Sequence, residues 1–167
     1  MKRIALVSIA LLMLVVSGCS SLPNSMPPVP IIEPIVIKSA STGGIALIDS
    51  GKIYVGNFHS GARAEYALKV KNNKGEDTKV EISWLEPSKT EAGYAKAPIV
   101  VKDWIEGFGS YLVRKGETAE ILVAVAMPDN AESPAPKWEF WLNVLDVGQM
   151  GDVQTALGSR WLITMRD

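Results

Sequence analysis

Histidine and cysteine, which readily act as bases, nucleophiles and metal ligands, occur once each in the 167-residue chain, as His59 and Cys19. A Ser–His–Asp triad could use His59, but no Gly-x-Ser-x-Gly motif accompanies it. The neighbouring Gly56, Ser60 and Gly61 predict a turn at a strand end instead. One histidine and one cysteine cannot supply the ligands of a zinc site. The sequence therefore predicts no catalytic residues, no metal site and no cofactor, and indicates a protein that is not an enzyme.

The carboxylates are scattered along the chain rather than paired in a known motif. Asp129, Glu132, Asp146 and Asp152 fall near predicted loops, so weak calcium binding is one interpretation. The alternative, that they are solvated loop residues, is favoured because the chain has no Asp-x-Asp-x-Asp-Gly loop. It also has no Gly-x-x-x-x-Gly-Lys loop of the kind that binds phosphate.

An aromatic run at residues 137–142, with the sequence KWEFWL, is the most informative feature of the second half of the chain. Successive side chains of a β-strand point to opposite faces, so Trp138 and Phe140 share one face and Trp141 lies on the other. We predict that Trp138 belongs to the core of the domain. The same alternation on an earlier strand predicts a core position for Trp84.

Trp141 is the candidate binding residue. It shares its face of the strand with Glu139 and Asn143, which places it outside the core. An exposed tryptophan suits stacking on a sugar or contact with a protein. The alternative is that Trp141 is packed under the glycine-rich loop at residues 148–158.

The first 18 residues predict a secretory signal peptide. Lys2 and Arg3 precede thirteen uncharged, mostly apolar residues, Ile4 to Val16, and small residues end the segment. As a helix this run spans roughly 20 Å, which is too short for a hydrocarbon core of about 30 Å. A permanent transmembrane anchor is therefore the weaker interpretation.

Val16-Ser17-Gly18-Cys19 resembles the lipobox of bacterial lipoproteins. The resemblance implies that a diacylglyceryl group is attached to the sulfur of Cys19 and that cleavage before Cys19 makes it the new N-terminus. The alternative is an ordinary signal peptide with a chance cysteine. Two or three acyl chains on one residue anchor a protein durably, whereas one chain holds it only marginally. Ser20 is not the aspartate that, by the same resemblance, retains lipoproteins at the inner membrane, which favours the outer membrane in an organism with two membranes.

Residues 19–44 predict a tether between the lipidated cysteine and a folded domain at residues 45–167. Proline lacks an amide donor and fixes φ, so its abundance favours extended polyproline conformations. The prolines of this stretch are Pro23, Pro27, Pro28, Pro30 and Pro34. The segment Ile31–Ile37 is too apolar for a simple linker and is the candidate for an additional edge strand.

From residue 45 onward, short apolar runs alternate with turn signals, which predicts an all-β domain. Alternation at period two marks five strands, and three shorter apolar runs bring the set to about eight. The five are centred on residues 66–70, 80–84, 119–125, 138–144 and 161–165, and the shorter runs are Ile53–Val55, Ile99–Val101 and Tyr111–Val113. Several short strands with regular turns imply a sandwich or a barrel.

The second half of the chain resembles immunoglobulin-like domains of bacterial and archaeal cell surfaces. The shared features are Trp104-Ile105, Tyr111-Leu112, the turn Lys115-Gly116-Glu117-Thr118, the alternating Ile121, Val123 and Val125, and Pro128-Asp129-Asn130-Ala131. The resemblance is closest over about residues 104–145. It implies an immunoglobulin-like antiparallel β-sandwich of about seven to eight strands, but a fold alone does not determine a function.

The charge balance argues against a nucleic-acid partner. The chain has 17 Lys and Arg against 18 Asp and Glu. Without Lys2 and Arg3 the balance becomes 15 against 18, a net charge of −3. Nucleic-acid binding calls for a clustered basic face, which the sequence does not indicate.

Three functional interpretations follow. The first is a membrane-anchored envelope lipoprotein that acts as a non-catalytic binding or scaffold module for an envelope protein or a polysaccharide. The second is a periplasmic assembly factor or chaperone-like protein that works by β-strand addition, with Ile31–Ile37 as a self-supplied strand that blocks an edge. The third, and least favoured, is a hydrolase with an unrecognised site.

Overall fold

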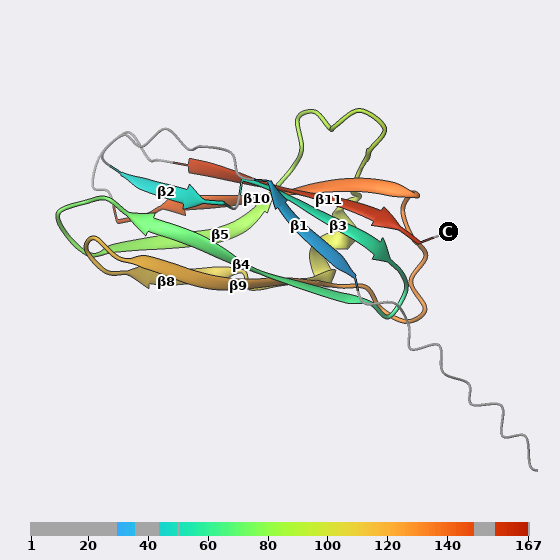
Figure 1. The fold of residues 1–167 in the computed structure, drawn as a ribbon, viewed down its shortest axis with the longest axis horizontal. Coiled ribbons are helices and arrows are strands. Elements are labelled where there is room, and N and C mark those ends of the chain that lie inside the picture. The colour runs from blue at the N-terminus through green and yellow to red at the C-terminus, as the bar shows by residue number, and fades with distance from the viewer. Residues whose placement is uncertain (1–29, 36–43, 50, 149–155, 167) are drawn as a thin grey trace, which may run out of the picture.

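Two β-sheets pack face to face in the computed structural model, which describes residues 30–35, 44–49, 51–148 and 156–166 (Figure 1). Cys19 and the predicted signal peptide lie outside the described residues. The larger sheet contains seven strands and the smaller sheet four. The predicted all-β, immunoglobulin-like sandwich is therefore confirmed.

The order of strands defines which side chains can meet. Across the larger sheet it is β1 (Ile31–Ile35), β3 (Lys52–Phe58), β11 (Ala156–Met165), β10 (Lys137–Asp146), β5 (Thr78–Leu85) and β8 (Gly109–Val113), with β6 (Ala95–Lys96) also beside β10. Across the smaller sheet it is β2 (Ile45–Ile48), β4 (Arg63–Asn72), β9 (Thr118–Ala126) and β7 (Ile105–Glu106). Paired strands are antiparallel except for β3 with β11 and β6 with β10.

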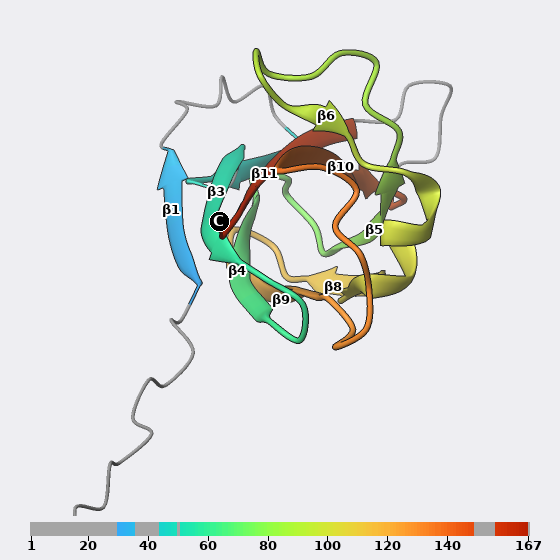
Figure 2. The same ribbon diagram turned by 90° about the vertical axis from the view of Figure 1, so that its right-hand side faces the viewer.

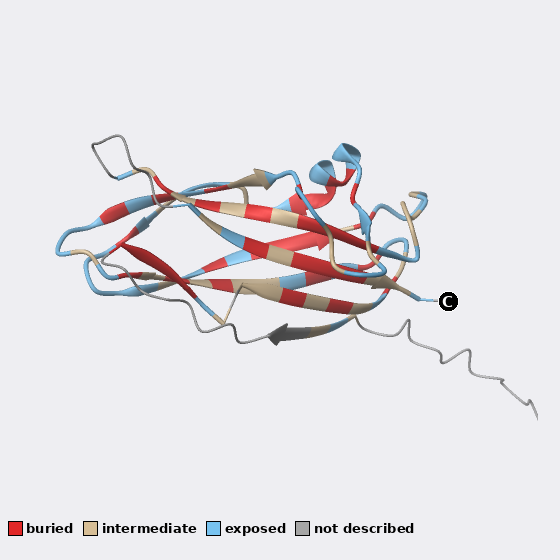
Figure 3. Cartoon of the chain, turned by 90° about the horizontal axis from the view of Figure 1, so that it is seen from above, coloured by how far each residue is buried: buried red, intermediate tan, exposed pale blue. Residues whose placement is uncertain are grey.

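The core lies between the two sheets and follows the alternation of the sequence. On β10, Trp138, Phe140 and the next two inward-facing residues are fully buried, and Figure 3 shows the buried positions along the strands. Phe140 stacks on Trp161 with ring centroids 5.4 Å apart, and Trp138 meets Phe58 edge-on at 6.2 Å. The predicted core position of Trp138 is confirmed.

Trp84 departs from its predicted place in the core, because it is only half-buried. It does lie on the inner side of β5 and stacks on Phe140, with ring centroids 5.9 Å apart and an interplanar angle of 7°. However, it stands near the end of β5, where no strand of the described part of the chain covers the outer edge. One side of the ring therefore reaches the surface.

The predicted short strand at Ile99–Val101 is wrong, since a 3-10 helix, η1 (Ile99–Trp104), occupies this stretch. The Val101 N–H donates to the Pro98 carbonyl at 3.0 Å, which closes the first turn. Val101 and Trp104, three residues apart, face the core, whereas Ile99 is 69% exposed. A short apolar run does not distinguish a strand from a single helical turn.

Within the described ranges, no helix has the length and apolar character that crossing a membrane requires.

The segment Ile31–Ile37 is the predicted candidate for an additional edge strand, and its described part forms β1 (Ile31–Ile35). β1 pairs antiparallel with β3, with Ile32 opposite Val55, and Figure 2 shows β1 at the margin of the sandwich. Ile32 packs against the core. Pro34 fits because one side of an edge strand needs no ladder hydrogen bonds. The sequence indicated this strand only as a candidate, because prolines favour an extended tether over the same stretch.

Candidate functional site

The outer face of the larger sheet brings together the charged and aromatic side chains that could form a site. Strand register places them in rows, since Trp141 is opposite Arg160 and Arg160 is opposite Lys52. In the next row Glu139 is opposite Leu162, which is opposite Tyr54. The outer-face cluster, as we call it, consists of Lys52, Tyr54, Glu91, Glu139, Trp141 and Arg160.

Glu91 joins the cluster from the loop at residues 86–94, which connects β5 to β6. β5 pairs with β10 only from Trp141 onward, and β6 pairs with β10 at Trp138 and Glu139. The loop between β5 and β6 therefore leaves the sheet between these two pairings. The Glu91 N–H donates to Glu139 Oε2 at 2.7 Å and ties the loop to the sheet. This loop and β6 rise beside β10 and β11 in Figure 2.

Glu139 is the central acceptor of the cluster and is completely buried. Its Oε1 accepts a hydrogen bond from Arg160 Nε at 2.7 Å and another from Trp141 Nε1. Arg160 Nη2 and Lys52 Nζ reach Glu91 Oε2 at 3.3 Å and 2.7 Å. Two cations and two carboxylates therefore form one continuous network across three strands and a loop.

The network keeps Glu139 ionised. Burial by itself raises the pKa of this carboxyl group, because charge is less favourable away from water. Hydrogen bonds from Arg160, from the Glu91 N–H and from Trp141 act in the opposite direction and together hold the pKa of Glu139 below its ordinary value. A carboxylate that is held so firmly by donors is suited to position its neighbours rather than to exchange protons.

Trp141 faces out of the core, as its position in the strand predicts, but it is half-buried rather than free. The Arg160 guanidinium lies 5.3 Å from the centre of its ring. The indole N–H is occupied by Glu139. Most of the glycine-rich loop proposed as an alternative cover, residues 149–155, lies outside the described residues. The role of Trp141 in binding stays a prediction.

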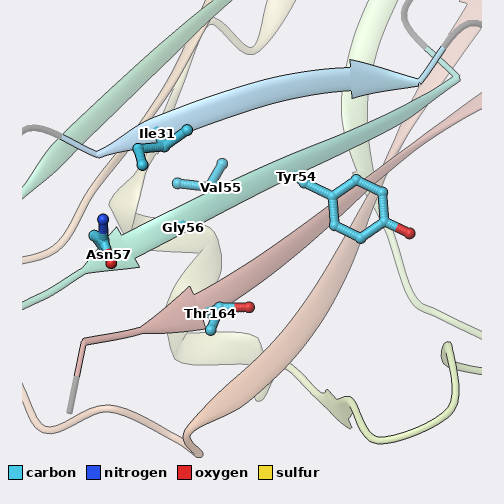
Figure 4. A pocket seen from close by; sticks show the side chains of 6 residues that line it. All are labelled: Ile31, Tyr54, Val55, Gly56, Asn57 and Thr164. Atoms are coloured by element: carbon cyan, nitrogen blue, oxygen red, sulfur yellow. The ribbon is translucent and has the colours of Figure 1, made fainter.

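A shallow pocket of about 300 Å³ lies beside the cluster, at the end of β3 (Figure 4). Its lining residues come from three strands and are Ile31, Tyr54, Val55, Gly56, Asn57 and Thr164. The Lys52 ammonium lies 5.4 Å from the centre of the Tyr54 ring, and the Thr164 hydroxyl is 3.2 Å from the Tyr94 hydroxyl. The pocket therefore offers an aromatic surface, a hydroxyl and an amide, with the charges at its border.

Sequence reasoning did not find Tyr54. Period-two alternation around Ile53 and Val55 would have placed Tyr54 outward, but many residues face outward. The parallel pairing of β3 with β11 brings Tyr54 into the same sheet as Trp141, and the sequence gives no sign of that pairing.

The remaining candidates for chemistry do not converge. His59 lies in the turn after β3, and its Nδ1 is 3.3 Å from the Asn57 carbonyl oxygen. Across the ranges that the structure describes, no group of three His, Cys, Asp or Glu residues is arranged to hold a metal ion. Asp152 lies outside those ranges.

Asp146 points into one end of the sandwich rather than into a solvated loop. It is fully buried, accepts hydrogen bonds from the Thr78 hydroxyl at 2.7 Å and the Gly148 N–H at 3.1 Å, and has Lys74 Nζ 2.5 Å from its Oδ2. Burial raises the pKa of Asp146, but these donors outweigh it and lower the pKa. The interpretation of Asp146 as a solvated acidic residue is therefore wrong. Asp146 instead joins β10 to Thr78 and Lys74 at this end of the sandwich.

The sequence matches no known family model and no curated protein. Solved structures do share its fold. The ASH / PapD-like domain of human CEP192 (PapD-like domain 7) superposes with a TM-score of 0.51 at 12% identity, over 81% of this chain and 95% of that one. A putative carbohydrate binding protein from Bacteroides ovatus gives 0.55 at 10% identity, over 73% and 37%. The periplasmic chaperone SfaE gives 0.50 at 15% identity, over 74% and 59%.

These likenesses support the class of the fold, an immunoglobulin-like β-sandwich similar to that of PapD-like domains. At 10–15% sequence identity, these structures show only that the fold is shared. The chain spans 37% of the length of the Bacteroides ovatus protein and 59% of the length of SfaE, which is less than two thirds of each.

Proposed function

We propose that this protein is an exported, lipid-anchored, non-catalytic binding module of the cell envelope, and that the outer-face cluster and its pocket bind an envelope polysaccharide. The observation that carries the proposal is the pocket beside the Tyr54 ring, where an aromatic surface adjoins the neutral hydrogen-bonding groups of Asn57 and Thr164. Binding sites of this kind combine apolar or aromatic walls with a few placed polar groups. The likeness to a putative carbohydrate binding protein supports the same class of ligand.

The arrangement favours a polymer over a single sugar. Trp141 and Tyr54 lie on strands that are separated by β11, which puts their backbones two strand spacings, about 10 Å, apart across the sheet, and they are offset by a further two residues along it. One sugar ring does not reach both aromatic side chains, whereas an extended chain of sugar units does. The network around Glu139 holds the loop and Arg160 in place, so the surface is organised before the ligand arrives.

Binding to polysaccharide should depend on the Tyr54 ring. We expect Tyr54→Ala, and separately Trp141→Ala, to weaken binding to purified envelope polysaccharide about tenfold, which corresponds to the roughly 1.4 kcal/mol that an aromatic contact can contribute. Tyr54→Phe, which keeps the ring, should retain binding. The measurement is co-sedimentation or calorimetry with polymer and, separately, with its monosaccharides.

The matched control is Leu122→Ala, an exposed apolar residue on the other sheet, which should bind like the unchanged protein. The proposal is wrong if Leu122→Ala weakens binding as much as Tyr54→Ala, or if no envelope polysaccharide fraction binds the full chain.

The anchor rests on the lipobox and can be tested apart from the ligand. We expect radiolabelled palmitate to enter the protein in growing cells and Cys19→Ser to abolish the label, because acylation needs the thiol. The variant should leave the membrane fraction or remain unprocessed, while Ser21→Ala, just outside the motif, should be labelled normally. A correctly processed Cys19→Ser protein that still sediments with membranes would contradict the anchor.

A second candidate function is β-strand addition, in which a partner's strand extends a sheet. The edge of β3 does not favour it, because β1 already occupies that edge. The observation that favours it lies toward the opposite side of the same sheet, where the last part of β5 pairs with β10 on one side and meets no strand of the described residues on the other.

A further inference from the structure

The last part of β5 has a strand on one side only. β8 pairs with Thr78–Ile82 and begins at Gly109, opposite Ile82. Beyond that point, Ser83–Leu85 pair with β10 but meet no strand of the described chain on their other side. A row of main-chain N–H and C=O groups at an open edge is a template for another extended chain.

The gap beside β5 is a consequence of how the chain changes sheets. β7 belongs to the smaller sheet and β8 to the larger, and the crossing between them is Gly107-Phe108-Gly109. Gly107 has φ +95°, and a Cβ there would lie 2.5 Å from the Leu122 carbonyl oxygen. The crossing is thus pressed against β9, and the chain reaches β5 only at Gly109.

A cavity of about 370 Å³ occupies this gap. Four consecutive residues of β5, Glu81 to Trp84, line it together with Lys102, Phe108 and Gly109. Consecutive residues alternate between the two faces of a sheet, so a cavity that touches all four lies at the edge of the strand, where the next strand would run. Its position, rather than its size alone, indicates an extended ligand.

The residues that line the cavity indicate which side chains an extended ligand would need to carry. Trp84 and Phe108 are both half-buried, and Trp84 is braced from behind by its stack on Phe140. Lys102 and Glu81 are exposed at the rim, and neither forms an ion pair within the described part of the chain. The rim therefore presents one unpaired cation and one unpaired carboxylate beside an aromatic gap.

We propose that the open edge of β5 binds an extended peptide of a partner protein, which adds a short strand beside Ser83–Leu85. An apolar side chain of the peptide fills the gap between Trp84 and Phe108, and an acidic side chain pairs with Lys102. Main-chain groups at the edge select a peptide over a sugar or a lipid, because a peptide satisfies them with its own N–H and C=O groups. Leu85 pairs with Trp141 of the outer-face cluster on its β10 side, whereas the peptide would lie on the other side of β5, so this proposal does not rest on polysaccharide binding.

The test uses the full chain and a synthetic, acetylated heptapeptide of threonines with a central phenylalanine flanked by one glutamate and one lysine. Binding is followed by backbone amide NMR. We expect saturable shifts at residues 81–85 and 107–109, and about tenfold weaker binding by Lys102→Glu. The peptide with lysine in place of its glutamate should recover binding to Lys102→Glu, because the charges again match.

One further probe distinguishes strand addition from side-chain contact alone, and another distinguishes this site from the polysaccharide site. The same peptide N-methylated at alternate residues keeps its side chains but loses main-chain donors, and we expect it not to bind. Tyr54→Ala should bind the peptide like the unchanged protein, so a failure of the polysaccharide proposal leaves this one intact. The proposal is overturned if no peptide binds at millimolar concentration, if Lys102→Glu binds the glutamate peptide equally well, if the methylated peptide binds, or if the shifts follow dilution of the chain alone, which would mean a second copy at this edge.

Discussion

Arg160→Met is expected to destabilise the domain by about 3–5 kcal/mol, the usual loss when one partner of a buried ion pair is removed. The reason is the position of Glu139, which stays buried while its charged donor is lost. Methionine preserves most of the packing of the arginine stem, so the loss reports the charge. Equilibrium unfolding in urea at pH 7 measures it.

The double variant Arg160→Met with Glu139→Gln should recover much of the loss, since no buried charge remains. An exposed pair provides the matched control. Lys96 and Glu86 form a salt bridge in which the side chains are 47% and 73% exposed, so Lys96→Met should change the free energy of unfolding far less than Arg160→Met does. Equal losses in Lys96→Met and Arg160→Met would show that burial of Glu139 is not the cause.

The pH dependence gives an independent check with a definite sign. The pKa values of Glu139 and Asp146 are lowered in the folded protein from 4.5 and 3.8. The stability they contribute is therefore fully present above those values and is lost as the pH falls through the folded pKa values. In Arg160→Met the pKa of Glu139 should rise, because burial then outweighs the remaining donors. The difference in the free energy of unfolding between the unchanged protein and Arg160→Met should therefore become smaller from pH 7 to pH 4. A difference that stays constant over this range would mean that Arg160→Met destabilises the domain through lost packing.

The strands could be predicted from the sequence because their signal is local. Alternation marks β4, β5, β9, β10 and β11, and seven of the eight candidate runs form strands in the structure. The failure at Ile99–Val101 has a physical cause, since three apolar residues after a proline satisfy a helical turn as well as a strand. β1 was foreseen only as a candidate, because prolines and strand residues share the same short stretch.

The candidate site could be predicted only in part. Alternation places Trp141 outward, but it does not show that Arg160 lies opposite or that Glu139 is buried on the outer face. Those facts depend on register between strands far apart in sequence and on the loop that carries Glu91. The open edge of β5 is likewise invisible in the sequence, because it results from where β8 starts.

Trp138→Ala is expected to cost about 3–5 kcal/mol, the usual loss for a buried aromatic side chain. The ring is fully buried and contacts Phe58, Trp104 and Phe140 at centroid distances of 6.1–6.2 Å. Typical domains have a total stability of roughly 5–15 kcal/mol, so this variant should be largely unfolded at modest urea concentrations. Trp138→Phe, which keeps an aromatic ring, should lose much less.

Trp84→Ala tests whether the edge of the sandwich is open as described. Trp84 is half-buried and has one stacked partner, Phe140, so we expect a loss of about 1–3 kcal/mol, smaller than for Trp138→Ala. Urea unfolding of both variants under the same conditions measures the difference. If Trp84→Ala is as damaging as Trp138→Ala, then the ring is enclosed in solution, the gap beside β5 is closed, and a peptide has no place between Trp84 and Phe108. A clearly smaller loss leaves the wall of the gap accessible, which is what strand addition at β5 requires.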